Sequence, residues 1–589
     1  MRRNLHQLSE TEYDVLIVGA GAFGACAARD AALRGLRTAL IERNDFGGGT
    51  SAECFKMVHG GIRYLQHADL KRLRASCHER SALLRIAPHL VHPLPIAIPT
   101  YGHGRRGSLF LGTGARLYDA LTWGRNTGIR DRERHIDGTR ILDRGEVLAL
   151  FPALESPELS GAVVFEDGQM HNPARLVLAF VSSAVHAGAD VANRVEALRY
   201  RWKDNTVVGA RVRDTETGNE FDIRAKLTLN ASGPWADYLC LQDDRFKDHQ
   251  REPFSRDAYF VIDRAPAHDH ALAVQGLSRD KDALLGRATR HLFMAPWRDK
   301  TLVGVWHRGF DRNPDLARVA PEEIDHWIAE VNQVHPALKI DRSEVTFANC
   351  GLVPFGETAT ESELSFGKES RVIDHRARDG VNGLVTLIGI RYTTARADAA
   401  QALELLLQQS GMKTSRPKTE DLPVAGGNIA DFAQFAREAY AAWPAHVSRG
   451  ALAGVLRNFG TDHLALLDRV KADPSAAATI PHTTTLLGEV AHAVDHEMAL
   501  RLEDVVLRRT DLAGGSHPGS AALLLAANEM ATRLRWSAKR TADEVHATEQ
   551  ILRNHLAKPA IQGAQRQPAV DAAASPQATM PAMAFLGNL

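Results

Sequence analysis

The chain has 589 residues and equal numbers of basic and acidic side chains, 71 of Lys and Arg and 71 of Asp and Glu. This length predicts two or three domains, and the zero net charge argues against a nucleic-acid binder that relies on bulk positive charge. The five scattered cysteines form no CxxC pair, the N-terminus is polar and no apolar run is long enough to span a bilayer, which together favour a reducing, cytoplasmic location.

Residues 13–42 predict a βαβ unit that binds a dinucleotide. An apolar strand runs into Gly19-x-Gly21-x-x-Gly24, and a helix of small residues and a second strand follow, ending at Glu42. Gly19 permits the turn, Gly21 lets the backbone approach a pyrophosphate, and Gly24 lets helix and strand pack closely. The helix N-terminus would face the phosphates, and Glu42 would accept hydrogen bonds from ribose hydroxyls.

The next stretch holds a polar loop, a helix and a basic, apolar segment. Residues 50–64 predict a loop dense in Gly, Ser, Thr and His, which leads into a helix over 69–86, and prolines then interrupt the chain. Residues 104–125 combine arginines with leucines and aromatic side chains. A membrane-surface element is one interpretation, and an amphipathic helix packed on its own domain is the favoured one.

Beyond residue 170, strands and helices alternate before the chain becomes helical. The expected elements are a helix over 173–190, strands over 191–213, a strand over 226–233, antiparallel strands over 256–310, a strand over 384–388, a helix over 395–407 and helices over 428–556. The strand that ends at Ala231-Ser232-Gly233 has small residues where a cofactor can approach the backbone. The composition from about residue 562 predicts disorder.

Several motifs spread along the chain carry a family resemblance. They are the glycine turn with Glu42, Arg34-Gly35-Leu36, Thr50-Ser51, Lys56, His59-Gly60-Gly61-Ile62-Arg63-Tyr64-Leu65, Asn230-Ala231-Ser232-Gly233-Pro234-Trp235, Thr393-Thr394 and Leu507-Arg508-Arg509-Thr510. Together they resemble the FAD-dependent glycerol-3-phosphate dehydrogenases, which are DAO-type flavoproteins, over nearly the whole chain. The resemblance implies FAD as the cofactor and hydride transfer from a hydroxyl-bearing carbon to flavin N5, with quinone or oxygen as the electron acceptor.

The resemblance also implies an α/β fold with a Rossmann-type FAD-binding domain, an antiparallel-sheet substrate domain and a C-terminal all-helical domain. The expected boundaries are the first part of the FAD-binding domain at 1–100, a connecting or cap segment at 101–170, the second part of the FAD-binding domain at 171–255, the substrate domain at 256–350, the last part of the FAD-binding domain at 351–420, the helical domain at 421–560 and a disordered tail at 561–589.

The positions expected to bind FAD belong to these motifs or lie close to the predicted strands. They are Gly19, Gly21, Gly24, Glu42, Arg43, Thr50, Ser51, Lys56, Gly60, Gly61, Val195, Ser232, Gly233, Gly389 and Thr393. No metal site is expected.

Several substrate-facing positions depart from the family pattern. The chain has Gly304-Val305-Trp306-His307 where the family has Gly-Thr-Thr-Asp, Val353 where the family has an arginine that contacts the substrate phosphate, and Arg391 where the family has a lysine. Retained FAD-binding positions together with replaced substrate-facing positions are typical of a flavoenzyme whose substrate has changed. A polyol, a sugar or one of their phosphates is expected rather than glycerol 3-phosphate itself.

Six residues are candidates for substrate binding and catalysis. Arg63, Tyr64 and Trp306 are expected to bind the substrate, Arg63 through a bidentate fork. His307 is the candidate for taking the alcohol proton, because the pKa of histidine is near the working pH. Arg391 would stabilise the reduced flavin or bind substrate, and His59 would either act beside the flavin or only pack there.

Two other functions remain open. The protein could be an oxidase that uses oxygen on an amine or hydroxy acid, or a flavin-binding protein that has lost catalysis. The expected partners are a small-molecule substrate and an electron acceptor, but no nucleic acid. Peripheral contact with the inner face of the cell membrane and a homo-oligomer also remain open.

Overall fold

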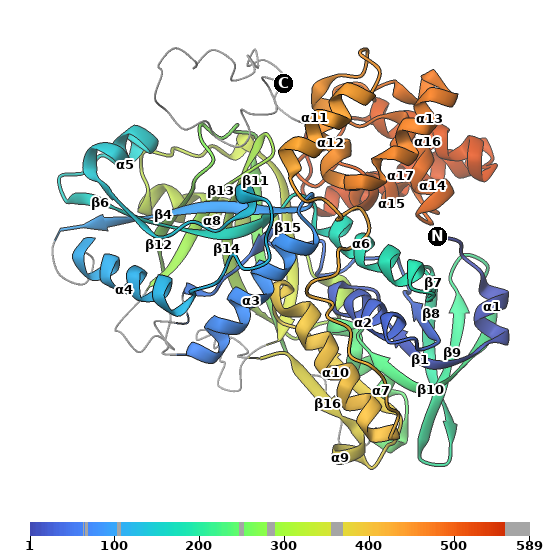
Figure 1. Cartoon of the computed structure of the whole chain (residues 1–589). Helices are drawn as coiled ribbons and strands as arrows, with labels where there is room; N and C mark the ends of the chain where they lie inside the picture. Colours follow the sequence, from blue (N-terminus) through green and yellow to red (C-terminus); the bar gives the residue numbers. More distant parts are fainter. Residues whose placement is uncertain are drawn as a thin grey trace.

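The structure is a computed structural model that describes residues 1–62, 64, 69–102, 108–246, 253–279, 289–354 and 369–559 (Figure 1). The predicted disorder of residues 561–589 concerns residues outside these ranges. No helix within them is both long and apolar enough to cross a bilayer.

The first sheet contains the predicted βαβ unit. Over the described ranges it has eight strands in the order β16-β17-β10-β1-β2-β7, and the β8–β9 hairpin joins it at β10. Its strands are β1 (Glu12–Val18), β2 (Thr38–Ile41), β7 (Asp190–Ala192), β8 (Val195–Lys203), β9 (Thr206–Asp214), β10 (Glu220–Asn230), β16 (Arg371–Asp374) and β17 (Leu384–Ile388). Because β1 pairs in parallel with both β10 and β2, their carboxyl ends meet at one edge, where such sheets bind ligands.

Both faces of this sheet are covered, which explains the continuous apolar run in β1. Val15 and Ile17 pack with helices α2 (Ala22–Leu33), α6 (Pro173–His186) and α10 (Ala395–Ser410). Leu16 and Val18 point to the other face and pack with the β8–β9 side. The start of α6 is fixed as the sequence predicts, with Pro173 in its first turn and the Asn172 side chain accepting from the Arg175 N–H.

The second sheet draws on more of the chain than the sequence predicted. Over the described ranges it has nine strands in the order β15-β11-β14-β13-β12-β4-β6-β3, with β5 on β6. The expected antiparallel strands are β11 (Phe254–Ile262), β12 (Ala271–Arg279), β13 (Thr289–Trp297) and β14 (Lys300–Phe310). β15 (Val345–Pro354), which pairs with β11, lies beyond the range in which the sequence predicted strands. Added to them are β3 (Met57–Val58), β4 (Val91–Tyr101), β5 (Arg140–Asp143) and β6 (Leu159–Met170).

Residues 101–170 are therefore not merely a connecting segment, because β6 from that segment pairs along the length of β4. Ile96 of β4 and Phe165 of β6 share an apolar core with Tyr259 of β11. Burial of this common face joins the early strands to the later ones. The helices around the sheet are α3 (Leu70–Ile86), α4 (Ser108–Leu121), α5 (Arg144–Leu150) and α8 (Pro321–Val334), and the short helices elsewhere are α1 (Leu5–Glu10), α7 (Ala236–Leu241) and α9 (His375–Asp379).

The predicted C-terminal helices gather at the upper right of Figure 1, in orange and red. They are α11 (Phe432–Ala442), α12 (Arg449–Phe459), α13 (His463–Ala472), α14 (Leu487–His496), α15 (Leu502–Asp504), α16 (Ser520–Leu534) and α17 (Ala538–Asn554). Val490, Leu502 and Leu523 from these helices share an apolar core with Trp297 and Phe347 of the second sheet. The helical region is thus packed directly on that sheet.

Candidate functional site

The glycine turn connects β1 to α2, and steric contacts explain its residues. Gly19 has a φ of +98°, and a Cβ there would lie 2.7 Å from the Cα of Ser232. A Cβ on Gly24 would lie 1.8 Å from the carbonyl oxygen of Gly19. The turn and the helix are therefore in direct backbone contact, as the spacing of the glycines predicts.

Glu42 follows β2 and lines the cavity beside this turn. Its carboxylate accepts hydrogen bonds from the backbone N–H groups of Ala20 at 2.8 Å and Asn44 at 3.0 Å. Burial raises the pKa of Glu42, and these two bonds offset the rise in part. An ionised carboxylate offers about four acceptor sites, so Glu42 retains the capacity to accept bonds from ribose hydroxyls.

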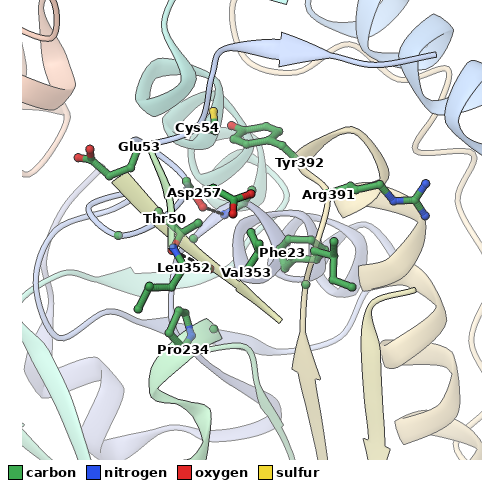
Figure 2. Close-up of a pocket in the computed structure, with 18 of the residues that line it drawn as sticks. Phe23, Thr50, Glu53, Cys54, Pro234, Asp257, Leu352, Val353, Arg391 and Tyr392 are labelled. Atoms are coloured by element: carbon green, nitrogen blue, oxygen red, sulfur yellow. Dashed lines mark hydrogen bonds between the residues drawn. The ribbon is translucent and has the colours of Figure 1, made fainter. Parts of the chain in front are cut away.

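A cavity of about 1080 Å³ extends from the glycine turn to the second sheet. Figure 2 shows Phe23 and Thr50 from the nucleotide-binding side, Asp257 and Val353 from the second sheet, and Arg391 around it. Ligand sites typically have volumes of about 300–1,000 Å³, so this cavity is large enough for a long cofactor together with a small substrate.

Most of the positions predicted to bind FAD line this cavity. They are Gly19, Gly21, Glu42, Arg43, Thr50, Ser51, Gly61, Val195, Ser232, Gly233, Gly389 and Thr393. Two of them also hold the wall together, since the Thr393 hydroxyl accepts from the His59 N–H at 3.0 Å and Ser51 Oγ accepts from the Ala22 N–H at 2.9 Å. We still propose these positions as contacts of the cofactor, and all of them lie in the wall of one cavity.

Three other predicted FAD positions are not brought to the cavity wall. Gly24 packs against the turn, and a Cβ on Gly60 would lie 2.2 Å from Nη1 of Arg80. Lys56 is buried, bonds the Tyr259 hydroxyl and lies 4.6 Å from the Trp297 ring. Burial lowers the pKa of Lys56 to about 8. These residues support the wall from behind, because their side chains or α-hydrogens face the protein interior.

Trp306 does not lie in the cavity wall, which corrects its expected role in substrate binding. Its ring stacks on Trp327 at 4.7 Å and on Phe260 at 5.5 Å, and its Nε1 donates to Glu330 at 2.8 Å. Successive side chains of a strand point to opposite faces, so His307 lines the cavity while Trp306 packs toward α8. The prediction for Arg63 concerns a residue outside the described ranges.

Arg391 and Tyr64 meet at one end of the cavity with two residues of α3. Nη1 of Arg391 donates to the Tyr64 hydroxyl and to Ser76 Oγ, both at 3.0 Å. The guanidinium groups of Arg72 and Arg391 lie 4.8 Å and 5.4 Å from the Tyr64 ring. Among the described residues, the bonded partners of Arg391 are hydroxyl groups rather than carboxylates. This corner is therefore suited to an anionic or hydroxylated group.

His59 lies beside this corner and faces a buried carboxylate. Its Nδ1 is 3.5 Å from Asp167, and Asp167 also accepts from Arg80 at 2.7 Å and from the Gly60 N–H at 2.5 Å. Burial alone would raise the pKa of Asp167, but the bond to His59 and the charge of Arg80 hold it below its usual value. An ionised Asp167 orients the His59 ring at the cavity edge.

His307 and Asp257 form a second histidine–carboxylate pair in the cavity wall. They lie opposite each other on the paired strands β14 and β11, and His307 Nδ1 is 2.7 Å from Asp257 Oδ1. Ser255 Oγ donates to the same carboxylate oxygen at 2.6 Å. If Nδ1 carries the proton that the carboxylate accepts, the imidazole lone pair lies on Nε2. This pairing makes His307 a candidate proton acceptor in the cavity wall.

The cavity contains residues that the sequence analysis did not single out. Arg72 and Ser76 are four residues apart in a predicted helix and so share one face. This spacing of two polar residues could have indicated that they belong to one site. Asp257 is a charged residue in the first half of a strand whose later residues, from Ala258 on, are apolar or aromatic, which is also a visible signal. Asn554 and His555 line the cavity from the helical region, and no local pattern connects them to residues some 500 positions earlier.

The residues around the turn fit the ADP half of FAD. The backbone of Gly19 and Gly21 lines the cavity beside the start of α2, and the Glu42 carboxylate is next to Val195 on the same wall. A helix N-terminus with glycines suits a pyrophosphate, and the acid suits a ribose. In the part of the chain that the structure describes, no group of three or more His, Cys, Asp or Glu side chains is placed to hold a metal ion.

Two family matches cover most of the chain. Residues 14–391 match the family described as FAD dependent oxidoreductase, and residues 417–541 match the C-terminal domain of alpha-glycerophosphate oxidase. The chain is 31% identical over 525 residues to glycerol-3-phosphate dehydrogenase of Synechocystis sp. (strain ATCC 27184 / PCC 6803 / Kazusa), covering 87% of this chain and 91% of that protein.

A second relative and one solved structure show how far the likeness reaches. The mitochondrial glycerol-3-phosphate dehydrogenase of Homo sapiens is 33% identical over 437 residues, which cover 71% of this chain but 56% of that protein. The structure of the glycerol-3-phosphate dehydrogenase from Bacillus halodurans complexed with FAD superposes with a TM-score of 0.71 at 22% identity, covering 95% of this chain and 97% of that one. The fold is therefore shared along almost the entire length of both chains.

Proposed function

Because the chain belongs to the FAD dependent oxidoreductase family and to its glycerol-3-phosphate dehydrogenase branch, we propose that it oxidises a secondary alcohol of a polyol, a sugar or one of their phosphates. The resemblance, the fold class and FAD as cofactor, all predicted from the sequence, are confirmed. Bound FAD would supply the hydride acceptor, at flavin N5. The rest of the chemistry falls to side chains of this chain.

The observation that carries the proposal is the His307–Asp257 pair in the wall of the cofactor cavity. Oxidation of an alcohol requires a base that takes the hydroxyl proton while the hydride leaves the same carbon. The 2.7 Å contact with Asp257 would hold the His307 ring in one tautomer and stabilise its cation once the proton has been accepted. We propose that Nε2 of His307 accepts the hydroxyl proton of the substrate.

The Arg391 corner would hold the other end of the substrate. Arg391, bonded only to hydroxyl groups within the described residues, can add a bond to an anionic or hydroxylated substrate group beside Tyr64. His59, paired with Asp167, would contact the same group from the neighbouring wall. Val353 lines the cavity where the family has its phosphate-binding arginine, which supports a substrate other than glycerol 3-phosphate.

The decisive experiment follows the flavin absorbance of the anaerobic holoenzyme while candidate donors are added. Bleaching by polyols, sugars or their phosphates would support the proposal. Bleaching by amines or hydroxy acids, with peroxide formed once oxygen is admitted, would favour an oxidase. A flavin that dithionite reduces and none of these donors does would indicate a binding protein without catalysis.

The proposed function also includes an electron acceptor for the reduced flavin and a contact with a membrane surface. We propose quinone or oxygen as the acceptor, with the surface around α4 in contact with a membrane. Trp123 is 91% exposed and Leu117 is 54% exposed, with Arg116 beside them, while Ala115 and Tyr118 are buried on the opposite face. Helix α4 and the turn after it thus pack on their domain with one face and expose apolar side chains on the other, as interfacial helices do. A homo-oligomer stays a prediction.

A further inference from the structure

A buried ionic cluster joins the helical region to the segment that carries Glu42. Asp45 and Asp504 are completely buried, Arg509 is 1% exposed, and Arg194 and Arg508 are almost as deeply buried. Both acids and all three arginines are bonded within the cluster. A buried charge is tolerated only when it is paired with good geometry, so these contacts fix the relative positions of the segments that supply them.

Asp45 is the centre of the cluster and receives two consecutive arginines. Arg509 forms a bidentate pair with it, Nη1 to Oδ2 and Nη2 to Oδ1, both at 2.7 Å. Arg508 Nε donates to Oδ2 of the same carboxylate at 2.6 Å, and its Nη2 donates to Asp504 at 2.7 Å. Burial alone would raise the pKa of Asp45, but the charges of Arg509 and Arg508 hold it well below its usual value.

A local distortion of the backbone makes this convergence possible. Adjacent residues of a regular α-helix point in different directions, so they do not normally meet on one carboxylate. Here residues Val505–Arg509 form a π-helical turn directly after α15. Such turns are rare and are frequent at functional sites. The turn directs Arg508 and Arg509 together at a single acid of the nucleotide-binding domain.

The same cluster holds the two segments that form the ribose end of the cavity. Asp45 lies three residues after Glu42, and Arg194 directly precedes Val195. The backbone N–H groups of Arg194 and Val195 donate to the carbonyls of Asn44 and Glu42, each at 2.8 Å. Arg194 bonds Asp504 and Glu503 through its side chain. Movement of the helical region would therefore displace both walls around the ribose.

We propose that the C-terminal helical region clamps the cofactor, with Arg508 and Arg509 acting as positioning residues for the ADP half of FAD. Neither arginine lines the cavity, so each acts through Asp45 and the Glu42 segment. FAD binding and docking of residues 502–510 are then thermodynamically linked, and each stabilises the other. This inference goes beyond the proposed reaction and depends only on FAD as the cofactor.

The test compares Arg509→Lys and Arg508→Lys with Arg533→Lys as the matched control. Lysine keeps the positive charge but cannot form the two simultaneous guanidinium hydrogen bonds to the acids of the cluster. Arg533 lies in the same helical region and pairs with Asp495 at 2.6 Å near the surface. The rate of FAD release from each full-length holoenzyme is followed by the rise in flavin fluorescence after dilution. Couplings of this kind are worth about 5–150-fold, so we expect release at least about tenfold faster in the two cluster variants and unchanged in the control.

A second measurement separates positioning from simple loss of stability. Thermal unfolding with and without added FAD gives the stabilisation that FAD confers, which should shrink in Arg509→Lys. Hydrogen exchange should show slower exchange of amides 502–510 in the wild-type holoenzyme than in the FAD-depleted chain. Three results would each overturn the clamp. The first is FAD release from both cluster variants at the wild-type rate. The others are equal losses of Tm with and without FAD, and identical exchange of amides 502–510 in the wild-type holoenzyme and the FAD-depleted chain.

Discussion

Gly24 and His307 show how single residues set the properties of the cavity. Gly24 is fixed by a backbone contact, since any side chain there meets the Gly19 carbonyl. His307 is held by a neighbour on the next strand, Asp257, whose carboxylate favours a proton on Nδ1 of the ring. A change at Gly24 would therefore affect cofactor retention through sterics, and a change at His307 would affect turnover through proton transfer.

Replacing Gly24 by alanine should damage the cofactor site. The new Cβ would lie 1.8 Å from the Gly19 oxygen, so the turn must move, at a cost of about 1–3 kcal/mol as for other overpacked positions. We expect a lower Tm and a lower ratio of FAD to protein, measured by thermal unfolding and flavin absorbance. Gly114→Ala is the control, because open space surrounds Gly114 on α4, and there a gain of about 0.5–1 kcal/mol is expected. Wild-type FAD content and Tm in Gly24→Ala would refute the steric argument.

Replacing His307 by asparagine should slow substrate-dependent flavin reduction by about 10²–10⁴-fold, the usual contribution of a general base. FAD content should not change, because the proposed role of His307 is to act on the substrate and not to hold the cofactor. Stopped-flow flavin absorbance measures the rate, and the exposed His326 of α8, as His326→Asn, provides the control. A rate within about twofold of wild type in His307→Asn, well short of such a loss, would remove His307 from the reaction.

At the scale of elements, the period of a strand or helix decides which side chains reach a surface. In β14 the alternation sends His307 to the cavity and Trp306 to the stack with Trp327 and Phe260. In α4 the helical period buries Ala115 and Tyr118 and exposes Leu117. Neighbouring residues of one element thus have different roles according to the face on which the element places them.

The exposed face of α4 leads to a prediction about vesicles. The holoenzyme should co-sediment with vesicles that contain anionic phospholipid, and Leu117→Ala with Trp123→Ala should reduce the bound fraction several-fold, since about 25 cal/mol is lost per Å² of buried apolar surface. Leu464→Ala serves as the control, because Leu464 is equally exposed, at 55%, on a helix of the C-terminal region. Equal binding of the double variant and the wild type would place any membrane contact elsewhere.

At the scale of the whole molecule, buried polar groups connect regions that are distant in the sequence. Arg175 of α6 pairs with Glu497 after α14 at 2.7 Å, and Asp45 pairs with Arg508 and Arg509. Buried histidines add a dependence on pH. His463 accepts a hydrogen bond on Nδ1 from Trp443 Nε1 at 3.0 Å, and burial lowers its pKa to about 4.

The His463 contact predicts loss of stability in mild acid. The unfolded chain binds a proton at His463 near pH 6.5, while the folded protein resists it until about pH 4. Stability from this group is therefore complete above pH 6.5 and is lost as the pH falls toward 4. We expect the Tm to fall between pH 6.5 and 5, and to fall less steeply in His463→Gln than in the exposed-site control His446→Gln. Parallel slopes in the two variants would contradict this assignment.

The sequence by itself determined the parts of this protein that depend on neighbouring residues. The βαβ unit, the helix starting at Pro173, the strand over Leu384–Ile388 and the helical C-terminal region follow from local periodicity, caps and turn residues. The glycine turn with its acid and the HGGIRYL motif are also contiguous patterns, so the family and FAD follow from the order of residues alone.

Only the tertiary structure decided which distant residues meet. It placed strands β3, β4, β5 and β6 in one sheet with the later antiparallel strands. In the cavity it placed Asp257 against His307, put Arg72 and Ser76 beside Arg391, and turned Trp306 away. It also brought Arg508 and Arg509 to Asp45. These contacts span up to hundreds of residues and depend on burial of shared surfaces, which no local pattern encodes. The cofactor was therefore readable from the chain, whereas the arrangement around the substrate depended on packing.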